Sequence, residues 1–288
     1  MVNRVHFFTK LCKFIFKRTI YLSLFIVLLM LTDSQSAFEQ TVSSAYSVGM
    51  GNAMVATADF PQALYHNPAN LPAGNRIETI VSYQNYYQVP GLGQVDVTFC
   101  FPLASFPLGI ALNRYGNSAY RETCFTIGSA FNLWETARIG VRFQLFDLAI
   151  DRYGRSAAWG VSFGLQYPIS DDLNIGVVVG NINRPRISRV KEQLPQTMRL
   201  GLSYSPAEKI TIAFEVFRDI HFRQEYRAGI ACQLSPFLSL RAGFEEEMNV
   251  YSAGLGFWAD TITTGFDYAV RVHQVLGISH VFSLKIDL

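Results

Sequence analysis

The stretch Trp159-Gly160-Val161-Ser162-Phe163-Gly164-Leu165-Gln166-Tyr167 decides the fold. Large apolar side chains occupy every second position, and glycine, serine and glutamine occupy the positions between them. Because successive side chains of a β-strand point to opposite faces, this alternation predicts a strand with one apolar face and one small, polar face. The pattern returns at 198–204, 226–234, 262–270 and 278–288. The chain after residue 75 is therefore predicted to be all-β.

The polar face of these segments distinguishes two all-β architectures. A soluble sandwich also alternates, but its polar face meets bulk water and usually carries many lysines and glutamates. Here that face is rich in glycine and small residues with isolated charges, which suits the inside of a barrel. The segments are long enough to cross a bilayer when tilted, and barrel closure satisfies every backbone group within lipid. We therefore predict a transmembrane antiparallel β-barrel.

The pattern gives fourteen strands, an even number typical of bacterial single-chain barrels. They are predicted near 76–88, 94–103, 107–115, 120–132, 136–150, 156–168, 172–182, 195–205, 209–218, 223–234, 237–246, 249–258, 261–270 and 276–287. Tight turns at 168–172, 205–209, 235–237 and 258–261 follow even strands. The longest connection, 183–194, follows the seventh strand and is expected to face the cell exterior if the N-terminus is periplasmic.

Composition excludes several other classes of protein. Only 16% of the 288 residues are charged, and the mean hydropathy is +0.18. These values exclude a disordered chain, a coiled coil and collagen. The formal net charge is +2 with no basic block outside the N-terminus, so we expect no nucleic-acid partner. The four cysteines are too scattered for a disulfide framework.

Residues 1–37 have the organisation of a secretory signal peptide that is cleaved. Five basic residues and no acidic one lie between positions 4 and 18, an apolar run follows at 20–31, and Ser34, Ser36 and Ala37 supply small residues for a signal peptidase. The apolar run is shorter than the roughly 20 residues of a spanning helix. The alternative is a retained N-terminal anchor. Because cleavage removes the basic block, the positive net charge is a targeting feature.

Residues 38–75 precede the predicted barrel, 76–288, and are too short to form a domain. We predict that they form an N-terminal hatch, with residues 44–72 inside the lumen. Its candidate functional residues are Gly49, Gly51, Asp59, Asn67, Pro68 and Ala69. Proline interrupts any helix at the Asn-Pro-Ala motif, and the Asn67 side chain is expected to bond the backbone just beyond it. Asp59 or the Asn67 region is expected to contact lumen arginines; the alternative is a flexible periplasmic leader.

The strand alternation directs a set of charged side chains into the lumen. They are Arg138, Arg142, Arg199, Glu215, Arg227, Arg241, Glu245, Asp267 and Lys285. A charge removed from water must be paired. We therefore expect an internal ion-pair network that holds the barrel and the hatch together. The alternative is a polar conduit.

The sequence resembles the FadL-like outer-membrane proteins, and most closely the PorV/PorQ branch. The resemblance rests on Ser44–Ala53, on Asn67–Leu71, on Gly180–Asn183 with Leu194–Tyr204, and on Gly277–Leu284. It implies a fourteen-strand barrel with an N-terminal hatch. Two features depart from the family: the chain is short, and it ends in Leu288 instead of an aromatic residue.

No catalytic or metal-binding pattern emerges from the sequence. The five histidines share no metal-ligand spacing, and no Ser/His/Asp arrangement can be recognised. We therefore expect no enzyme activity, no cofactor and no metal. His66 is expected to be a hydrogen-bonding residue of the hatch. Residues 245–247, three consecutive glutamates, are expected to form a solvated tip of an outer hairpin.

Three functions fit a barrel of this kind in the bacterial outer membrane. The resemblance to PorV/PorQ implies a transport or protein-secretion component of the type IX kind. The second hypothesis is a FadL-type channel that takes up hydrophobic small molecules and releases them laterally through the wall. The third is a purely structural barrel. The lumen charges and short outer loops favour the first. The expected partners are outer-membrane lipid, secretion-machinery or cargo proteins, and a hydrophobic small molecule.

Overall fold

A computed structural model describes residues 37–38, 43–57, 60–103, 105–133, 136–187, 192–220, 222–246, 249–259 and 263–288. The predicted signal sequence up to residue 36 lies outside the described residues, and so does Asp59. All the statements below concern the unit formed by Ala37–Leu288.

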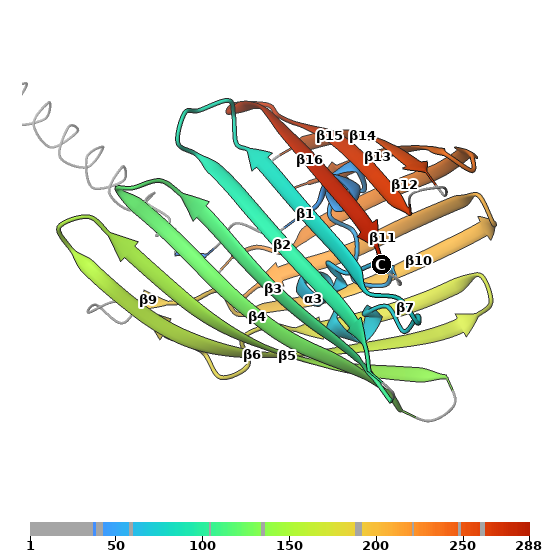
Figure 1. The fold of residues 1–288 in the computed structure, drawn as a ribbon, viewed down its shortest axis with the longest axis horizontal. Coiled ribbons are helices and arrows are strands. Elements are labelled where there is room, and N and C mark those ends of the chain that lie inside the picture. Colours follow the sequence, from blue (N-terminus) through green and yellow to red (C-terminus); the bar gives the residue numbers. More distant parts are fainter. Residues whose placement is uncertain are drawn as a thin grey trace, which may run out of the picture. The chain divides into compact units, whose positions relative to one another are not determined.

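This unit is a closed antiparallel barrel of fourteen strands (Figure 1). The strands are β1 (Glu78–Asn85), β2 (Gly93–Pro102), β3 (Pro107–Gly116), β4 (Tyr120–Leu133), β5 (Ala137–Ile150), β6 (Gly154–Ser170), β7 (Leu173–Val179), β10 (Thr197–Ala207), β11 (Ile210–Asp219), β12 (Glu225–Ser235), β13 (Leu238–Glu245), β14 (Val250–Ala259), β15 (Thr264–His273) and β16 (Gly277–Asp287). The first and last strands close the barrel, pairing from Glu78 with Asp287 to Asn85 with His280. The predicted fold class and strand number are confirmed.

The two ends of the barrel differ in their connections. The start of β1 and the end of β16 lie at one end, together with two-residue turns such as 171–172 and 208–209. The other end carries the longest connection between barrel strands, residues 180–196, which contains the small hairpin β8 (Arg186–Ile187) and β9 (Glu192–Gln193). Short turns face the periplasm in bacterial barrels. We therefore call these the periplasmic end and the outer end.

The two faces of the wall match the alternation of the sequence. Phe163 is 48% exposed on the outer surface, whereas its neighbour Ser162 is fully buried inside. The same contrast holds on β10, where Leu200 and Leu202 are exposed and Ser203 is buried. An outer surface of large apolar side chains is stable in lipid and not in water.

The strand boundaries differ from the predicted ones by up to three residues, and β6, β10 and β15 are examples. Pro168–Ser170 and Ser205–Ala207 belong to β6 and β10, where register shifts extend the strands and shorten the following turns. The fifteenth labelled strand, β15, begins three residues later than predicted and continues to His273. At the ends of β6 and β10, irregular pairing breaks the alternation from which the boundaries were inferred.

In the part of the chain that the structure describes, helical structure is confined to three short pieces before β1. They are α2 (Ala45–Gly49), α3 (Ala63–His66) and the 3-10 turn η1 (Pro68–Asn70). Among the described residues, no helix has the length and apolar character needed to cross a membrane.

Candidate functional site

Residues 43–57 and 60–72, which we call the plug, lie against the inner face of the barrel wall. Nearly all of them are buried, and Met50, Leu64 and Leu71 are fully so. The backbone nitrogen of Ala45 donates to Oγ of Ser283 on β16, at 2.8 Å. At the other end of the plug, the Sγ of Cys100 on β2 contacts the carbonyl oxygen of Pro72. The plug is therefore joined to the first and last parts of the wall.

The first helix of the plug is set by a capping box. The Ser44 side chain accepts from the backbone nitrogen of Ser47, and the Ser47 side chain accepts from the backbone nitrogen of Ser44. This reciprocal arrangement satisfies two donors that a helix start leaves open. Gly51 follows the helix with φ +59°, a left-handed conformation that favours glycine. A five-residue helix can persist here because burial and caps replace length.

The Asn-Pro-Ala motif is a backbone connector within the plug. As predicted, the Asn67 side chain caps the turn beyond it by accepting from the backbone nitrogen of Ala69, at 3.1 Å. Its amide nitrogen donates to the carbonyl oxygens of Val55 in the plug and Leu165 in the wall, at 2.7 and 3.1 Å. Asn70 also donates to Val55 O. The motif therefore ties the two halves of the plug to each other and to β6.

Wall glycines allow the plug backbone to approach the strands closely. A Cβ atom added to Gly243 would clash with the backbone nitrogen of Gly51, and one added to Gly140 would clash with that of Ala69. The same crowding against the plug occurs at Gly164, Gly176 and Gly229. The small inward face predicted from the sequence is thus the surface on which the plug rests.

Two inward arginines on β5 hold carbonyl groups of the plug. Arg138 Nη2 donates to Leu71 O at 2.7 Å, and Arg142 Nη1 donates to Leu64 O at 3.0 Å and also to Tyr65 O. Charged donors make stronger hydrogen bonds than neutral ones. These are the arginines that meet the region around Asn67.

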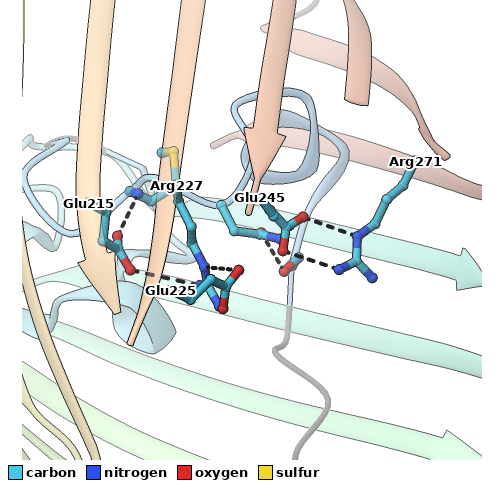
Figure 2. Close-up of polar contacts among 8 residues, drawn as sticks. Glu215, Glu225, Arg227, Glu245 and Arg271 are labelled. Carbon is cyan, nitrogen blue, oxygen red and sulfur yellow. Dashed lines mark hydrogen bonds and ion pairs between the residues drawn. The ribbon is translucent and has the colours of Figure 1, made fainter. Parts of the chain in front are cut away.

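Glu215 on β11 connects the plug to an ion-pair group. Its Oε2 accepts from the backbone nitrogens of Met54 and Val55, at 3.1 and 3.0 Å. Its Oε1 lies 3.7 Å from Arg227, which pairs with Glu225 at 2.9 Å. Figure 2 shows Arg227 between the two carboxylates. All three side chains are buried, so removing one partner would leave an uncompensated charge.

Two further ion pairs belong to the lumen network, in which Lys285 also pairs with Glu78 at 2.9 Å. Arg241 Nη1 donates to Asp267 at 2.5 Å, and its guanidinium lies 4.3 Å from the centre of the Tyr46 ring in the plug. Glu245 receives two hydrogen bonds from Arg271, at 3.0 and 3.1 Å (Figure 2). Glu245 is buried and also contacts Asn52, so the predicted solvated tip is wrong for Glu245; Glu246 is exposed.

Arg199 on β10 and His66 in the plug lie near Arg227 of the ion-pair group. The guanidinium groups of Arg199 and Arg227 lie 5.0 and 4.2 Å from the centre of the same Phe217 ring. Neither ring nitrogen of His66 has a hydrogen-bond partner among the described residues, so the predicted hydrogen-bonding role is wrong. Burial, and then the charges of Arg199, Arg227 and Arg142, lower the pKa of His66 well below its ordinary value. His66 is therefore neutral and packs near Phe60.

Sequence reasoning missed several charged residues that take part in these contacts, among them Glu225, Arg271 and Asp96. Glu225 shares the inward alternation of Arg227, which was a usable signal. Arg271 lies just beyond the predicted end of its strand, although it continues the alternation of Asp267. Asp96 on β2 accepts from Gln62 Nε2 at 2.9 Å and from the Tyr65 hydroxyl at 2.7 Å. Among the residues with described positions, no cluster of His, Cys, Asp and Glu is suited to a metal ion.

The periplasmic end of the lumen contains a cavity of about 350 Å³ beside the plug. Its lining includes Tyr46 and Phe60 from the plug, and Trp258, Arg241, Asp267 and Lys285 from the wall. A second cavity, of about 410 Å³, lies beside residues 73–75 and the β2–β3 turn. The first cavity combines aromatic surface with a few charged groups, as small-molecule sites commonly do.

The outer end of the lumen is apolar on one side. Inward side chains of β4–β6 form a buried cluster with the long outer connection. The cluster consists of Cys124, Phe146, Leu148 and Ala158 from the wall, Ile187 and Leu194 from residues 180–196, and Ala37. Lumen walls of transmembrane barrels are ordinarily polar. An apolar inner surface covered by an outer connection is a candidate binding surface for apolar molecules.

Solved structures of other proteins share this fold. A monoaromatic hydrocarbon channel, CymD, has a TM-score of 0.61 and 13% identity over 86% of this chain and 98% of that chain. The Pseudomonas putida toluene transporter TodX has a TM-score of 0.59 and 13% identity, over 87% and 98%. A Pseudomonas aeruginosa FadL homologue has a TM-score of 0.59 and 11% identity, over 85% and 98%. No protein-family model and no curated protein sequence matches the chain.

These likenesses extend over most of the chain and concern the fold. The chain has the architecture of FadL-type barrels, as the resemblance implied. A closed antiparallel barrel with an apolar outer surface is how bacterial outer-membrane proteins span lipid. The protein is therefore an outer-membrane barrel, and the predicted location is confirmed.

Proposed function

We propose that the protein is a non-enzymatic outer-membrane channel that binds and admits hydrophobic small molecules. In this proposal, residues 76–288 form the conduit and residues 38–75 form the hatch that closes it. The FadL-like fold supports it, because structures with this fold are described as hydrocarbon channels and toluene transporters. The proposal goes beyond the fold by naming the class of ligand.

The apolar surface inside the outer end carries the proposal. Phe146 and Leu148 point inward from β5 and are 4% and 5% exposed, covered by Ile187 and Leu194. Burying apolar surface contributes about 25 cal/mol per Å², so a cover of two side chains is a modest barrier. If residues 180–196 moved away, Phe146 and Leu148 would be uncovered. An apolar ligand could then take the place of Ile187 and Leu194 against them.

The plug separates this outer surface from the periplasmic cavity. Arg142, Glu215 and Arg241 each contact the plug from a different part of the wall. Passage therefore requires a rearrangement of the plug or of the wall beside it. The cavity of about 350 Å³ beyond the plug offers aromatic side chains, including Phe60 and Trp258, to a molecule that has passed.

The test is binding and uptake of a monoaromatic hydrocarbon such as toluene by the purified barrel and by proteoliposomes. Leu148→Asn should weaken binding by about tenfold, because it introduces an amide that a hydrocarbon leaves unpaired. Ser252→Asn is the matched control, since it adds the same side chain to an inward position on β14. Equal binding by the wild type and Leu148→Asn would refute the assigned surface, and absence of toluene binding by the wild type would refute the ligand class.

A protein-secretion role of the PorV/PorQ kind remains a second hypothesis, resting on the sequence resemblance. The solved structures support the channel hypothesis better, because their descriptions concern small hydrocarbons. Copurification from detergent-solubilised outer membrane distinguishes the two. Stoichiometric recovery of secretion proteins, together with absent hydrocarbon binding, would favour secretion.

A further inference from the structure

Exposed charge is distributed unequally between the two ends of the barrel. At the outer end, the exposed arginines of the described chain are Arg114, Arg152, Arg155, Arg184, Arg186, Arg218 and Arg223. The exposed acids described there are Asp151 and Glu246. At the periplasmic end, the exposed charges described are Arg76, Lys209, Asp171, Asp172 and Glu208. The outer end is thus strongly basic and the periplasmic end is close to neutral.

Four arginines occupy outward-facing positions just beyond the apolar surface. Arg114 comes two residues after Leu112 on β3, and Arg218 comes four residues after Phe214 on β11. Arg121 precedes Phe125 by four residues on β4, and Arg155 precedes Trp159 by four on β6. Leu112, Phe125, Phe214 and Trp159 are 51%, 43%, 45% and 60% exposed. With about 3.4 Å of rise per residue, these arginines reach headgroup depth.

Arg114 has no acidic residue directly or diagonally opposite it on the adjacent strands, whereas Asp147 on β5 is a diagonal neighbour of Arg121. The cross-strand neighbours of Arg114 are Val95 and Thr123, and those of Arg121 are Gly116 and Ala149. They are therefore diagonal neighbours at the β3–β4 hairpin, about 7–8 Å apart. Arg155 differs, because it pairs with Asp147 at 2.5 Å. The hairpins β3–β4 and β5–β6 project at the left of Figure 1.

We propose that Arg114, Arg121 and Arg155, together with Arg218 farther round the barrel on β11, bind phosphate groups of phosphorylated glycolipid molecules in the outer leaflet; we call these four residues the arginine rim. Guanidinium groups suit phosphate because they present several donors in a planar fork. Charge complementarity is supplied by the excess of arginine at the depth where lipid headgroups lie. The apolar side chains beneath the rim face the acyl chains of the same lipid. This inference concerns the outer surface and does not depend on what passes through the lumen.

The test uses folded protein in neutral detergent with three probes: bisphosphorylated lipid A, lipid A without phosphates, and inorganic phosphate. Native mass spectrometry and the heat-modification midpoint report binding. Bisphosphorylated lipid A should bind and raise the midpoint, whereas the other two probes should not. Each arginine near anionic lipid raises the binding constant by a factor of roughly five. The double variant R114Q/R121Q should therefore weaken binding by at least about tenfold.

The matched control is R76Q/K209Q, which removes two exposed cations from the periplasmic end. It should bind bisphosphorylated lipid A like the wild type. The single variants R114Q and R121Q, each with a smaller loss, preserve the test if the double variant does not fold. Equal binding of dephosphorylated lipid A, equal stabilisation by inorganic phosphate, or equal losses in both double variants would overturn the proposal.

Discussion

Oε2 of Glu215 accepts a hydrogen bond from the backbone nitrogen of Val55 at 3.0 Å. Val55 is also the residue whose carbonyl oxygen receives the Asn67 amide. The backbone of this one plug residue therefore connects β11 to the Asn-Pro-Ala motif, which itself bonds β6 through Leu165. Through this residue the plug links two parts of the wall, β6 and β11, which β7 and β10 separate in the barrel.

Glu215→Gln should destabilise the folded barrel by about 3–5 kcal/mol, because it leaves buried Arg227 with one carboxylate in place of two. Urea titration followed by heat-modified electrophoresis measures this change. Glu208→Gln, at an exposed turn position, serves as the control and should be close to neutral. A loss below about 1 kcal/mol would mean that Glu215 is not part of the connection.

Gly140→Ala should displace the plug from β5, because the new Cβ would clash with the backbone of Ala69. The expected cost is about 1–3 kcal/mol of overpacking, with increased protease cleavage within residues 43–72. At Gly74 an added Cβ meets no atom within 4 Å, so Gly74→Ala is the matched control. Unchanged protection of the plug in Gly140→Ala would contradict the close contact.

Phe163→Arg should cost about 2–4 kcal/mol, since it puts a charge on the lipid face of the long strand β6. The loop-tip variant Tyr153→Arg is the control, because that side chain is 84% exposed. Ser162→Arg is a poor inward comparison: Ser162 is fully buried and accepts from Arg142 and Asn181. A refolding titration measures both losses of stability. If Tyr153→Arg lost more stability than Phe163→Arg, the assignment of Phe163 to the lipid face would be wrong.

Acidification should destabilise the barrel through His66. The pKa of His66 is lowered in the folded state by burial and by Arg199, Arg227 and Arg142. The unfolded chain therefore binds this proton first, and stability is lost as pH falls below the ordinary pKa of about 6.5. His66→Leu should lose less stability than the wild type between about pH 7 and pH 5. Parallel losses in the two proteins would show that His66 is not responsible.

Much of the wall could be predicted from the sequence because strand alternation is a local property. It predicted that Arg142, Glu215 and Arg227 face inward, and they do. The partners could not be predicted in the same way, because they depend on strand register and on the path of the plug. Arg142 binds carbonyl groups of residues 64 and 65, which no alternation encodes.

The apolar inner surface was missed for a different reason. Around Phe146 and Leu148 both faces of β5 are apolar. The alternation of apolar and polar residues is therefore lost where the lumen lining becomes apolar. The sequence 143–150, in which apolar residues occur at both parities, contained that signal. Alternation correctly directed Glu245 into the lumen, whereas the three adjacent glutamates wrongly suggested that it lies at a solvated tip.

The contact between Ala45 and Ser283 joins residues 238 positions apart in the chain. Forming such contacts costs loop-closure entropy before it yields stabilisation, so proteins dominated by them fold slowly. Here this contact of α2 with the wall forms only when β16 is present, and β16 must also pair with β1 to close the barrel. Closing the wall and seating its contents thus become a single cooperative event, and a chain truncated before β16 would retain neither.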